Sequence, residues 1–137
     1  RSASTGNRFE PGKKPMSTMA PTMIFNKDGE LFLITGSPGG SLIPAAILRV
    51  VTGVIDFELD IGQATMLPRV HKDWPTTGIL HERTLNADSI RGIRNIGHKM
   101  TPEHTMGSTQ SIHIVDGVNY GYADLRRPNA SVSTQAN

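Results

Sequence analysis

A glycine-rich turn is the part of the sequence best suited to chemistry. The apolar run Leu31–Thr35 leads directly into Gly36-Ser37-Pro38-Gly39-Gly40, and Ser41 opens a second apolar run of helical length. The N–H groups of Gly39 and Gly40 would then lie at a helix N-terminus, where unpaired amides and the helix dipole favour negative charge. Such a pair is what an oxyanion hole or a phosphate site requires. A purely structural strand-to-helix turn is the alternative, and the run is neither a Walker loop nor a Rossmann fingerprint.

Ser17 and Thr18 are a second candidate because two adjacent hydroxyls precede an expected strand. They are able to hold a carboxylate through neutral hydrogen bonds, or to make a turn or a cap. The residue types alone favour the turn or cap.

The titratable residues give weaker signals. The five histidines have no regular spacing, and His98 and His104 are separated by Pro102, so those two cannot share one face of a continuous helix. No zinc signature is present, so we expect no metal site, and we expect no cofactor. No Gly-x-Ser-x-Gly elbow is present to indicate a serine nucleophile. Asp124 with Arg126 and Arg127 indicates an ion pair or a carboxylate clamp, with a surface pair as the more common outcome.

The elements that must position these residues can be read from apolar periodicity and turn residues. We predict strands over 22–25, 30–35, 111–115 and 118–122, short extended pieces over 69–71 and 78–82, and helices over 41–57, 61–67 and 86–96. Asp116-Gly117 is the strongest hairpin signal, and Asn86 is a suitable N-cap. The first helix is apolar on nearly every side, which predicts burial between layers. Hairpins alternating with helices indicate a layered α+β fold.

The composition limits the classes of function that are expected for this chain. The chain has 137 residues, no cysteine and a net charge of only +2, of which the first fourteen residues contribute +3 and the remainder −1. A nucleic-acid-binding face is therefore not expected, and disulfides and thiolate catalysis are excluded. The longest apolar run, Leu42–Val51, is too short to cross a bilayer. No signal peptide is visible, and a chain that opens with Arg1 is interpreted as a fragment. We expect a flexible arm over 1–15, one folded unit over 16–128 and a polar tail over 129–137.

The order of five motifs resembles γ-glutamyltranspeptidases over residues 11 to 128. Lys13–Thr22 is similar to the family's Pro-Leu-Ser-Ser-Met-Ser-Pro-Thr, and Thr35–Ser41 matches its most recognisable run. The remaining three are Pro68–His71 before Trp74, Met106–Ser111, which matches Met-Gly-Ser-Thr-Gln-Ser, and Asp124–Pro128, which is similar to Asp-Pro-Arg-Arg-Pro.

The resemblance implies the C-terminal part of the small subunit of an N-terminal nucleophile hydrolase, which is an αββα sandwich. Such a precursor cuts itself into two subunits, and a new N-terminal threonine attacks γ-glutamyl amides such as glutathione. The acyl-enzyme then passes the glutamyl group to water or to an amino acid or peptide. The complete protein would thus be a γ-glutamyltransferase and glutathione hydrolase.

Carried over by residue, Gly39 and Gly40 would donate backbone N–H groups to the oxyanion, and Ser17 and Thr18 would hold the α-carboxylate. The nucleophile motif Thr-Thr-His would precede Arg1, so the chain alone is expected to be inactive. Its partners would be the large subunit and the N-terminal part of the small subunit, in the periplasm or outside the cell. Exposed edges would let the fragment self-associate.

Two alternatives remain open at this point. One is a related acylase, for example a cephalosporin acylase or an enzyme that processes poly-γ-glutamate. The other is a catalytically dead homologue with a structural or binding role.

Overall fold

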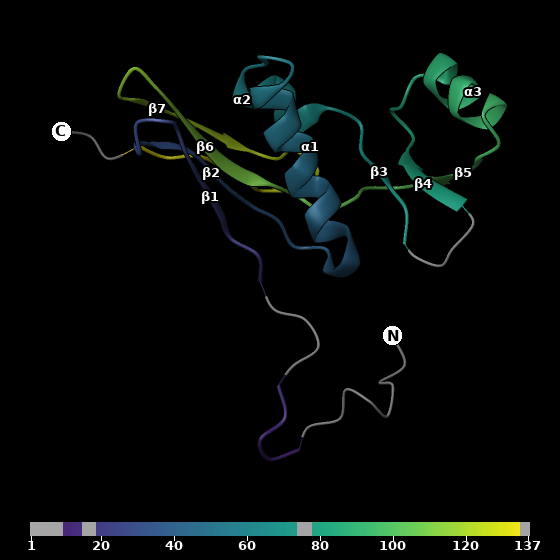
Figure 1. Ribbon diagram of the computed structural model, residues 1–137, viewed down its shortest axis with the longest axis horizontal. Coiled ribbons are helices and arrows are strands. Elements are labelled where there is room, and N and C mark those ends of the chain that lie inside the picture. The colour runs from purple at the N-terminus through teal and green to yellow at the C-terminus, as the bar shows by residue number, and fades with distance from the viewer. Residues whose placement is uncertain (1–9, 15–18, 74–77, 135–137) are drawn as a thin grey trace.

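The structure is a computed structural model that describes residues 10–14, 19–73 and 78–134. These residues form a four-stranded sheet of order β1-β2-β6-β7 and a three-stranded sheet of order β3-β4-β5, with helices packed against them (Figure 1). The strands are β1 (Thr22–Phe25), β2 (Leu31–Gly36), β3 (Val70–His71), β4 (Gly78–Glu82), β5 (Lys99–Glu103), β6 (Gln110–Val115) and β7 (Val118–Ala123). The helices are a short 3-10 turn η2 (Gly40–Leu42), α1 (Ile43–Ile55), α2 (Ile61–Met66) and α3 (Ala87–Asn95).

The four-stranded sheet is built from two hairpins that pair through β2 and β6, and all of its neighbours are antiparallel. In the β6–β7 turn, Asp116 and Gly117 both have positive φ angles, of 50° and 76°, as the sequence predicts for a tight hairpin. In the β1–β2 turn, Gly29 has a φ of 81°, and the Asn26 side chain accepts hydrogen bonds from the Asp28 and Glu30 N–H groups. Local turn chemistry therefore fixes both hairpins.

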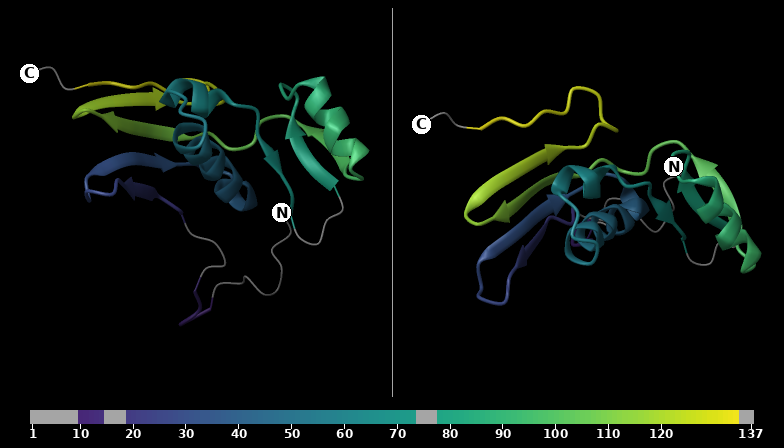
Figure 2. Two further views of the ribbon diagram at one scale, coloured as in Figure 1. Left: turned by 45° about the horizontal axis from the view of Figure 1, so that its top comes forward. Right: turned by 90° about the horizontal axis from the view of Figure 1, so that it is seen from above.

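Helices α1 and α2 cover one face of this sheet (Figures 1 and 2). The core between them consists of Leu33, Val50, Val54, Ile61 and Ala64, with Ile24, Phe32, Val51, Leu59 and Tyr122 packed around it. The predicted α+β layering is confirmed. Burial of the first helix on all sides is wrong in this chain, because a single sheet covers only one face of α1. Leu48, on the outer face, is 61% exposed.

The three-stranded sheet contains a β-α-β unit in which α3 connects the parallel strands β4 and β5. The Asn86 side chain caps α3 by accepting a hydrogen bond from the Ser89 N–H at 2.7 Å, and Gly97 past the end of the helix has a φ of 93°. Both were expected. Strand β5 was not predicted because it contains Pro102. Proline is tolerated there because β5 lies at the edge of the sheet, where the missing N–H breaks no ladder bond.

Residues 124–134 follow β7 and lie on the opposite side of the β6–β7 hairpin from α1 and α2 (Figure 2). Val132 packs directly on Gly121 of β7, where a Cβ atom would stand 2.8 Å from Val132 Cγ1. Within the described ranges, no helix is both long enough and apolar enough to cross a membrane.

Two helical glycines give a matched test of the packing between α1 and α2. A Cβ at Gly53 would lie 2.8 Å from Ala64 Cβ, whereas a Cβ at Gly92 on α3 would meet nothing within 4 Å. We predict that Gly53→Ala lowers the free energy of unfolding by about 1–3 kcal/mol through overpacking. Gly92→Ala should leave it unchanged or raise it by up to about 1 kcal/mol, because alanine is the better helix former. Urea-induced unfolding of both variants checks this, and equal effects would contradict it.

Candidate functional site

The glycine-rich turn joins the end of β2 to α1, as the sequence predicts, with the 3-10 turn η2 between them. Gly39 has a φ of 144° and Gly40 a φ of 60°, and L side chains rarely adopt such conformations. The Gly39 carbonyl accepts a hydrogen bond from the Leu42 N–H at 3.1 Å. Among the described residues, the N–H groups of Gly39 and Gly40 have no hydrogen-bond acceptor. Two amides are thus available for a ligand.

A hollow of about 870 Å³ lies beside this turn. It is lined by Met19, Ala20, Pro21, Gly36, Ser37, Pro38, Gly40, Ile43 and Gln110. The predicted carboxylate-binding residues Ser17 and Thr18 lie outside the described residues. Met19 follows them directly in the chain, so the described part of this segment reaches the same hollow as Gly40.

The segment Met106–Thr109 packs against the glycine-rich turn and forms a hydrogen bond with it. The Ser37 hydroxyl accepts a hydrogen bond from the Ser108 N–H at 3.0 Å and donates one to the Pro38 carbonyl at 2.8 Å. Gly107, with a φ of 72°, packs so closely that a Cβ there would stand 2.6 Å from Ser37 Oγ. The Met-Gly-Ser-Thr motif was recognised in the sequence, but its contact with the glycine turn was not predicted, since 71 residues separate Ser37 from Ser108.

A small polar cluster lies on the other side of the turn. His71 Nε2 is 2.9 Å from Asp73 Oδ1, and the Ser41 hydroxyl donates to Asp73 Oδ2 at 3.4 Å. Ser41 directly follows Gly40 within η2, so these contacts connect the end of β3 to the glycine-rich turn. No chemical role was predicted for His71, and Trp74 lies outside the described residues.

A buried cluster of four charged side chains contacts the Met106–Thr109 segment. Arg69 Nη2 lies 2.7 Å from Asp124 Oδ2, and the Arg69 and Asp124 side chains are 1% and 0% exposed. Arg126 binds both oxygens of Glu82 at 2.7 Å and also reaches Asp124 Oδ1 at 3.2 Å. The two positive charges of the arginines and the two negative charges of the carboxylates therefore cancel. The surface pair expected for Asp124 with Arg126 is therefore wrong, because the fold buries both and adds Arg69 and Glu82.

This cluster also holds the Met106–Thr109 segment by its backbone. Arg69 Nη1 donates to the Met106 carbonyl at 2.7 Å, and the Met106 N–H donates to Glu82 Oε1 at 2.9 Å. The Thr109 N–H donates to Asp124 Oδ2 at 2.9 Å. These four side chains therefore connect strands of both sheets with the Met106–Thr109 segment that packs against the glycine-rich turn.

The electrostatics favour the ionised form of both acids. Burial alone would raise the pKa of Asp124, but hydrogen bonds from the Arg126 N–H, the Arg69 guanidinium and the Thr109 N–H outweigh it and hold that pKa below its ordinary value. Burial would likewise raise the pKa of Glu82, but Arg126 and the Met106 N–H lower it. Burial lowers the pKa of Arg69, whereas for Arg126 the two carboxylates overcome burial and raise the pKa.

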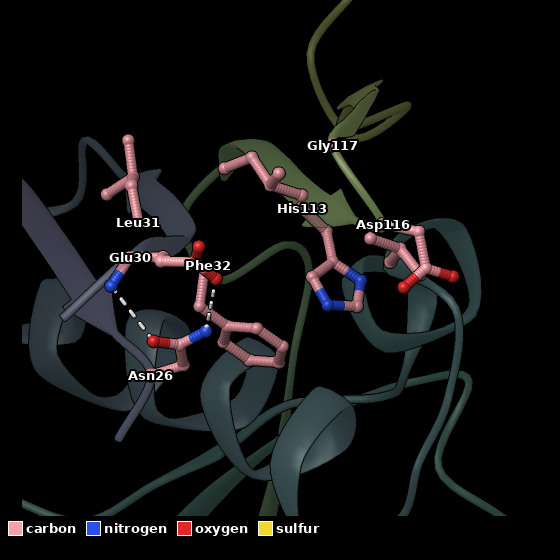
Figure 3. A pocket seen from close by; sticks show the side chains of 9 residues that line it. Asn26, Glu30, Leu31, Phe32, His113, Asp116 and Gly117 are labelled. Carbon is pink, nitrogen blue, oxygen red and sulfur yellow. Dashed lines mark hydrogen bonds between the residues drawn. The ribbon is translucent and has the colours of Figure 1, made fainter. Parts of the chain in front are cut away.

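A second hollow, of about 530 Å³, lies at the other end of β2, between the two hairpin turns (Figure 3). His113 lines it, with its ring edge-to-face against Phe32 at a centroid distance of 4.6 Å. Burial lowers the pKa of His113, and its Nε2 has no hydrogen-bond partner among the described residues. The neighbouring Glu30 carboxylate is already bound by the Asn26 amide at 3.0 Å. No convergent set of binding groups forms there.

The arrangement at the glycine turn is suited to binding a developing or fixed negative charge through backbone amides. In the ranges that the structure describes, no three His, Cys, Asp or Glu side chains gather in a way that would hold a metal ion.

Comparison with known proteins decides the family. The sequence profile described as gamma-glutamyltranspeptidase matches residues 2–134. The chain belongs to the γ-glutamyltranspeptidase family. It is 40% identical over 121 residues to a glutathione hydrolase proenzyme of Escherichia coli, an alignment that covers 88% of this chain and 21% of that protein. The chain thus spans about a fifth of the length of the curated relatives that it matches.

Solved structures agree with the family assignment. A γ-glutamyltranspeptidase of Helicobacter pylori superposes with a TM-score of 0.81 at 32% identity, covering 90% of this chain and 69% of that one. A cephalosporin acylase from Bacillus halodurans gives a TM-score of 0.84 at 24% identity, covering 94% of this chain and 24% of that one, and shows the fold alone. The predicted membership of the N-terminal nucleophile hydrolase fold is confirmed.

Removing one charge from the buried cluster tests its role in this family member. We predict that Asp124→Asn lowers the free energy of unfolding by about 3–5 kcal/mol, because it leaves the Arg69 guanidinium buried without its carboxylate. The exposed pair of Arg91 with Asp88 on α3 is the control, and Asp88→Asn should cost less than about 1 kcal/mol. Urea-induced unfolding of both variants measures the difference, and similar losses would refute the prediction.

The lowered pKa values also predict an acid dependence. The ordinary values are 3.8 for Asp124 and 4.5 for Glu82, and both carboxylates have lower pKa values in the folded protein. The unfolded chain therefore takes up protons first as the pH falls. The stability that the two carboxylates contribute is fully present above about pH 5 and is lost on acidification through the folded pKa values. Unfolding free energies of the wild type should decline across this range, with a shallower decline in Asp124→Asn and an unchanged one in Asp88→Asn.

Proposed function

We propose that this chain is the C-terminal part of the small subunit of a γ-glutamyltransferase and glutathione hydrolase. The observation that carries the proposal is the Gly39-Gly40 turn in a member of the γ-glutamyltranspeptidase family. Its two N–H groups have no acceptor among the described residues, and the turn lies beside a hollow. Relatives that are 40% and 31% identical to this chain are named glutathione hydrolase proenzymes. The word proenzyme supports a precursor that is processed into subunits.

In the proposed reaction, the Gly39 and Gly40 N–H groups stabilise the tetrahedral intermediate. Attack by a threonine hydroxyl on the γ-glutamyl carbonyl carbon moves the carbonyl electron pair onto oxygen, and the two amides donate hydrogen bonds to that oxyanion. The threonine's own α-amino group takes the hydroxyl proton during the attack and passes it to the leaving nitrogen, so that collapse of the intermediate expels the amine and leaves a glutamyl ester on the threonine. Water or an amino group then accepts the glutamyl group.

The remaining parts of the proposed site come from the start of this chain and from other parts of the precursor. Ser17 and Thr18 hold the donor's α-carboxylate, and Met19–Pro21, which follow them in the chain, line the hollow beside Gly40. The nucleophilic threonine belongs to the N-terminal part of the small subunit, and the large subunit completes the glutamate pocket. Glutathione and other γ-glutamyl compounds are the proposed donors, and the periplasm or the cell exterior the proposed location.

The organisation proposed for the chain is a flexible arm over 1–15, the folded part of the small subunit over 16–128 and a polar tail over 129–137. The apolar outer face of α1, with Leu48 and Ile55 exposed, supports packing against other parts of the precursor. The isolated chain would expose the same face, and self-association is the proposed consequence.

Expression of the complete coding sequence tests the proposal. We predict two bands on a denaturing gel and release of p-nitroaniline from γ-glutamyl-p-nitroanilide, with faster release when glycylglycine is present as acceptor. The 137-residue chain alone should give no turnover, because no acyl-enzyme forms without the threonine. A single uncut, inactive product would contradict the enzyme and favour the catalytically dead homologue. Preference for glutaryl amides over glutathione would favour an acylase.

A glycine variant in the same precursor tests the role of the turn. Gly39→Ala should lower kcat by about 10²–10³-fold, because it displaces an amide aimed at the oxyanion. Gly29→Ala is the matched control, since Gly29 also has a positive φ, of 81°, but lies in the remote β1–β2 turn with nothing within 4 Å of an added Cβ. Equal kinetic losses in the two variants would exclude the oxyanion role.

A further inference from the structure

The N–H groups of Gly39 and Gly40, which have no acceptor among the described residues, each belong to a peptide group whose carbonyl oxygen accepts a hydrogen bond. A trans peptide is planar, so its C=O and N–H bonds point in opposite directions, and fixing the carbonyl fixes the direction of the N–H. The Gly40 N–H shares a peptide group with the Gly39 carbonyl, which accepts from the Leu42 N–H at 3.1 Å. Backbone structure in η2 therefore orients the Gly40 amide.

The Gly39 N–H depends on a side chain instead. It shares a peptide group with the Pro38 carbonyl, and the Ser37 hydroxyl donates to that carbonyl at 2.8 Å. Proline has no N–H, so its own nitrogen contributes no donor to the local network. Within the described residues, the Ser37 proton is the only hydrogen-bond donor found on the Pro38 carbonyl.

The Ser37 hydroxyl is itself fixed from outside the turn. It accepts from the Ser108 N–H at 3.0 Å, which directs its single proton toward Pro38. Gly107 makes this approach possible, because a Cβ there would stand 2.6 Å from Ser37 Oγ and 3.1 Å from the Pro38 carbonyl oxygen. The neighbouring residues Met106 and Thr109 are bound by the buried carboxylates of Glu82 and Asp124.

We propose that Ser37 is a positioning residue for the oxyanion hole: its hydroxyl, held by Ser108, orients the Pro38–Gly39 peptide so that the Gly39 N–H faces the substrate carbonyl. This inference rests on the proposed function of the turn and adds a residue to it. Ser37 itself does not act on the reacting atoms. The alternative is a hydroxyl that only stabilises the turn.

The two roles predict different kinetics. The oxyanion exists only in the transition state, so misdirecting its donor lowers kcat and leaves ground-state binding unchanged. Ser37→Ala in the complete precursor should lower kcat for γ-glutamyl-p-nitroanilide about tenfold per processed enzyme, less than the ~10²–10³-fold loss of a whole donor. The KM and the inhibition constant of free L-glutamate should stay within about twofold. Ser37→Thr, which keeps the hydroxyl, should restore kcat.

Gly107→Ala is the second variant, because its added Cβ would push against the same hydroxyl, and it should reproduce the loss of kcat. Gly97→Ala is its matched control, with a φ of 93° but nothing within 4 Å of the added Cβ, and should leave kcat unchanged. The amount of processed enzyme is taken from the small-subunit band on a gel, and a thermal melt reports stability.

The outcomes separate the inference from the function beneath it. An active wild type with an unaffected Ser37→Ala variant would overturn the role of Ser37 and leave the proposed function standing. A lower melting temperature with unchanged kcat, or insoluble Ser37→Ala protein, would assign the hydroxyl to stability alone and also overturn it. An inactive wild-type precursor would refute both. Reduced kcat with unchanged KM and melting temperature, rescued by Ser37→Thr, would support it.

Discussion

The rest of the structure depends on four buried charges. Arg69, Glu82, Asp124 and Arg126 come from distant points in the chain and meet where the two sheets join. Burying an ion is costly, and only close partners and additional hydrogen bonds offset that cost. Here each guanidinium also binds backbone carbonyls and each carboxylate binds backbone N–H groups. Few other relative placements of the two sheets would satisfy all four side chains, so the cluster specifies the arrangement as well as stabilising it.

The geometry of the candidate site depends on that cluster. The carboxylates fix Met106 and Thr109, and the segment between them presents the Ser108 N–H to Ser37. Ser37 then holds the peptide of the glycine turn. An oxyanion hole must be preorganised, because amides that reorient during the reaction give little stabilisation. A glycine pair whose supporting segment is hydrogen-bonded to Glu82, Asp124 and Ser37 meets that requirement.

Local sequence patterns predicted most of the elements correctly. Asn26–Gly29, Asp116-Gly117 and the Asn86 cap act within a few residues of themselves, so their outcome depends little on the remainder of the chain. Strand β5 was missed because its Pro102 is permitted only at a sheet edge, and the edge is defined by strands far away in sequence. The outer face of α1 was expected to be buried, but the layer order leaves it open in this chain.

The sequence by itself determined the family, the α+β class and the glycine turn between β2 and α1, because motif order and backbone conformational preferences are local properties. Only the tertiary structure decided that Asp124 and Arg126 are buried, that Arg69 and Glu82 complete their charges, and that Gly107 lies against Ser37. Glu82 and Arg126 are 44 positions apart in the chain, and Arg69 and Asp124 are 55 positions apart. No local pattern encodes these contacts. The same sequence neighbours are compatible with an arginine whose guanidinium stays at the surface and with one whose guanidinium is buried, and only the fold decides which of the two occurs.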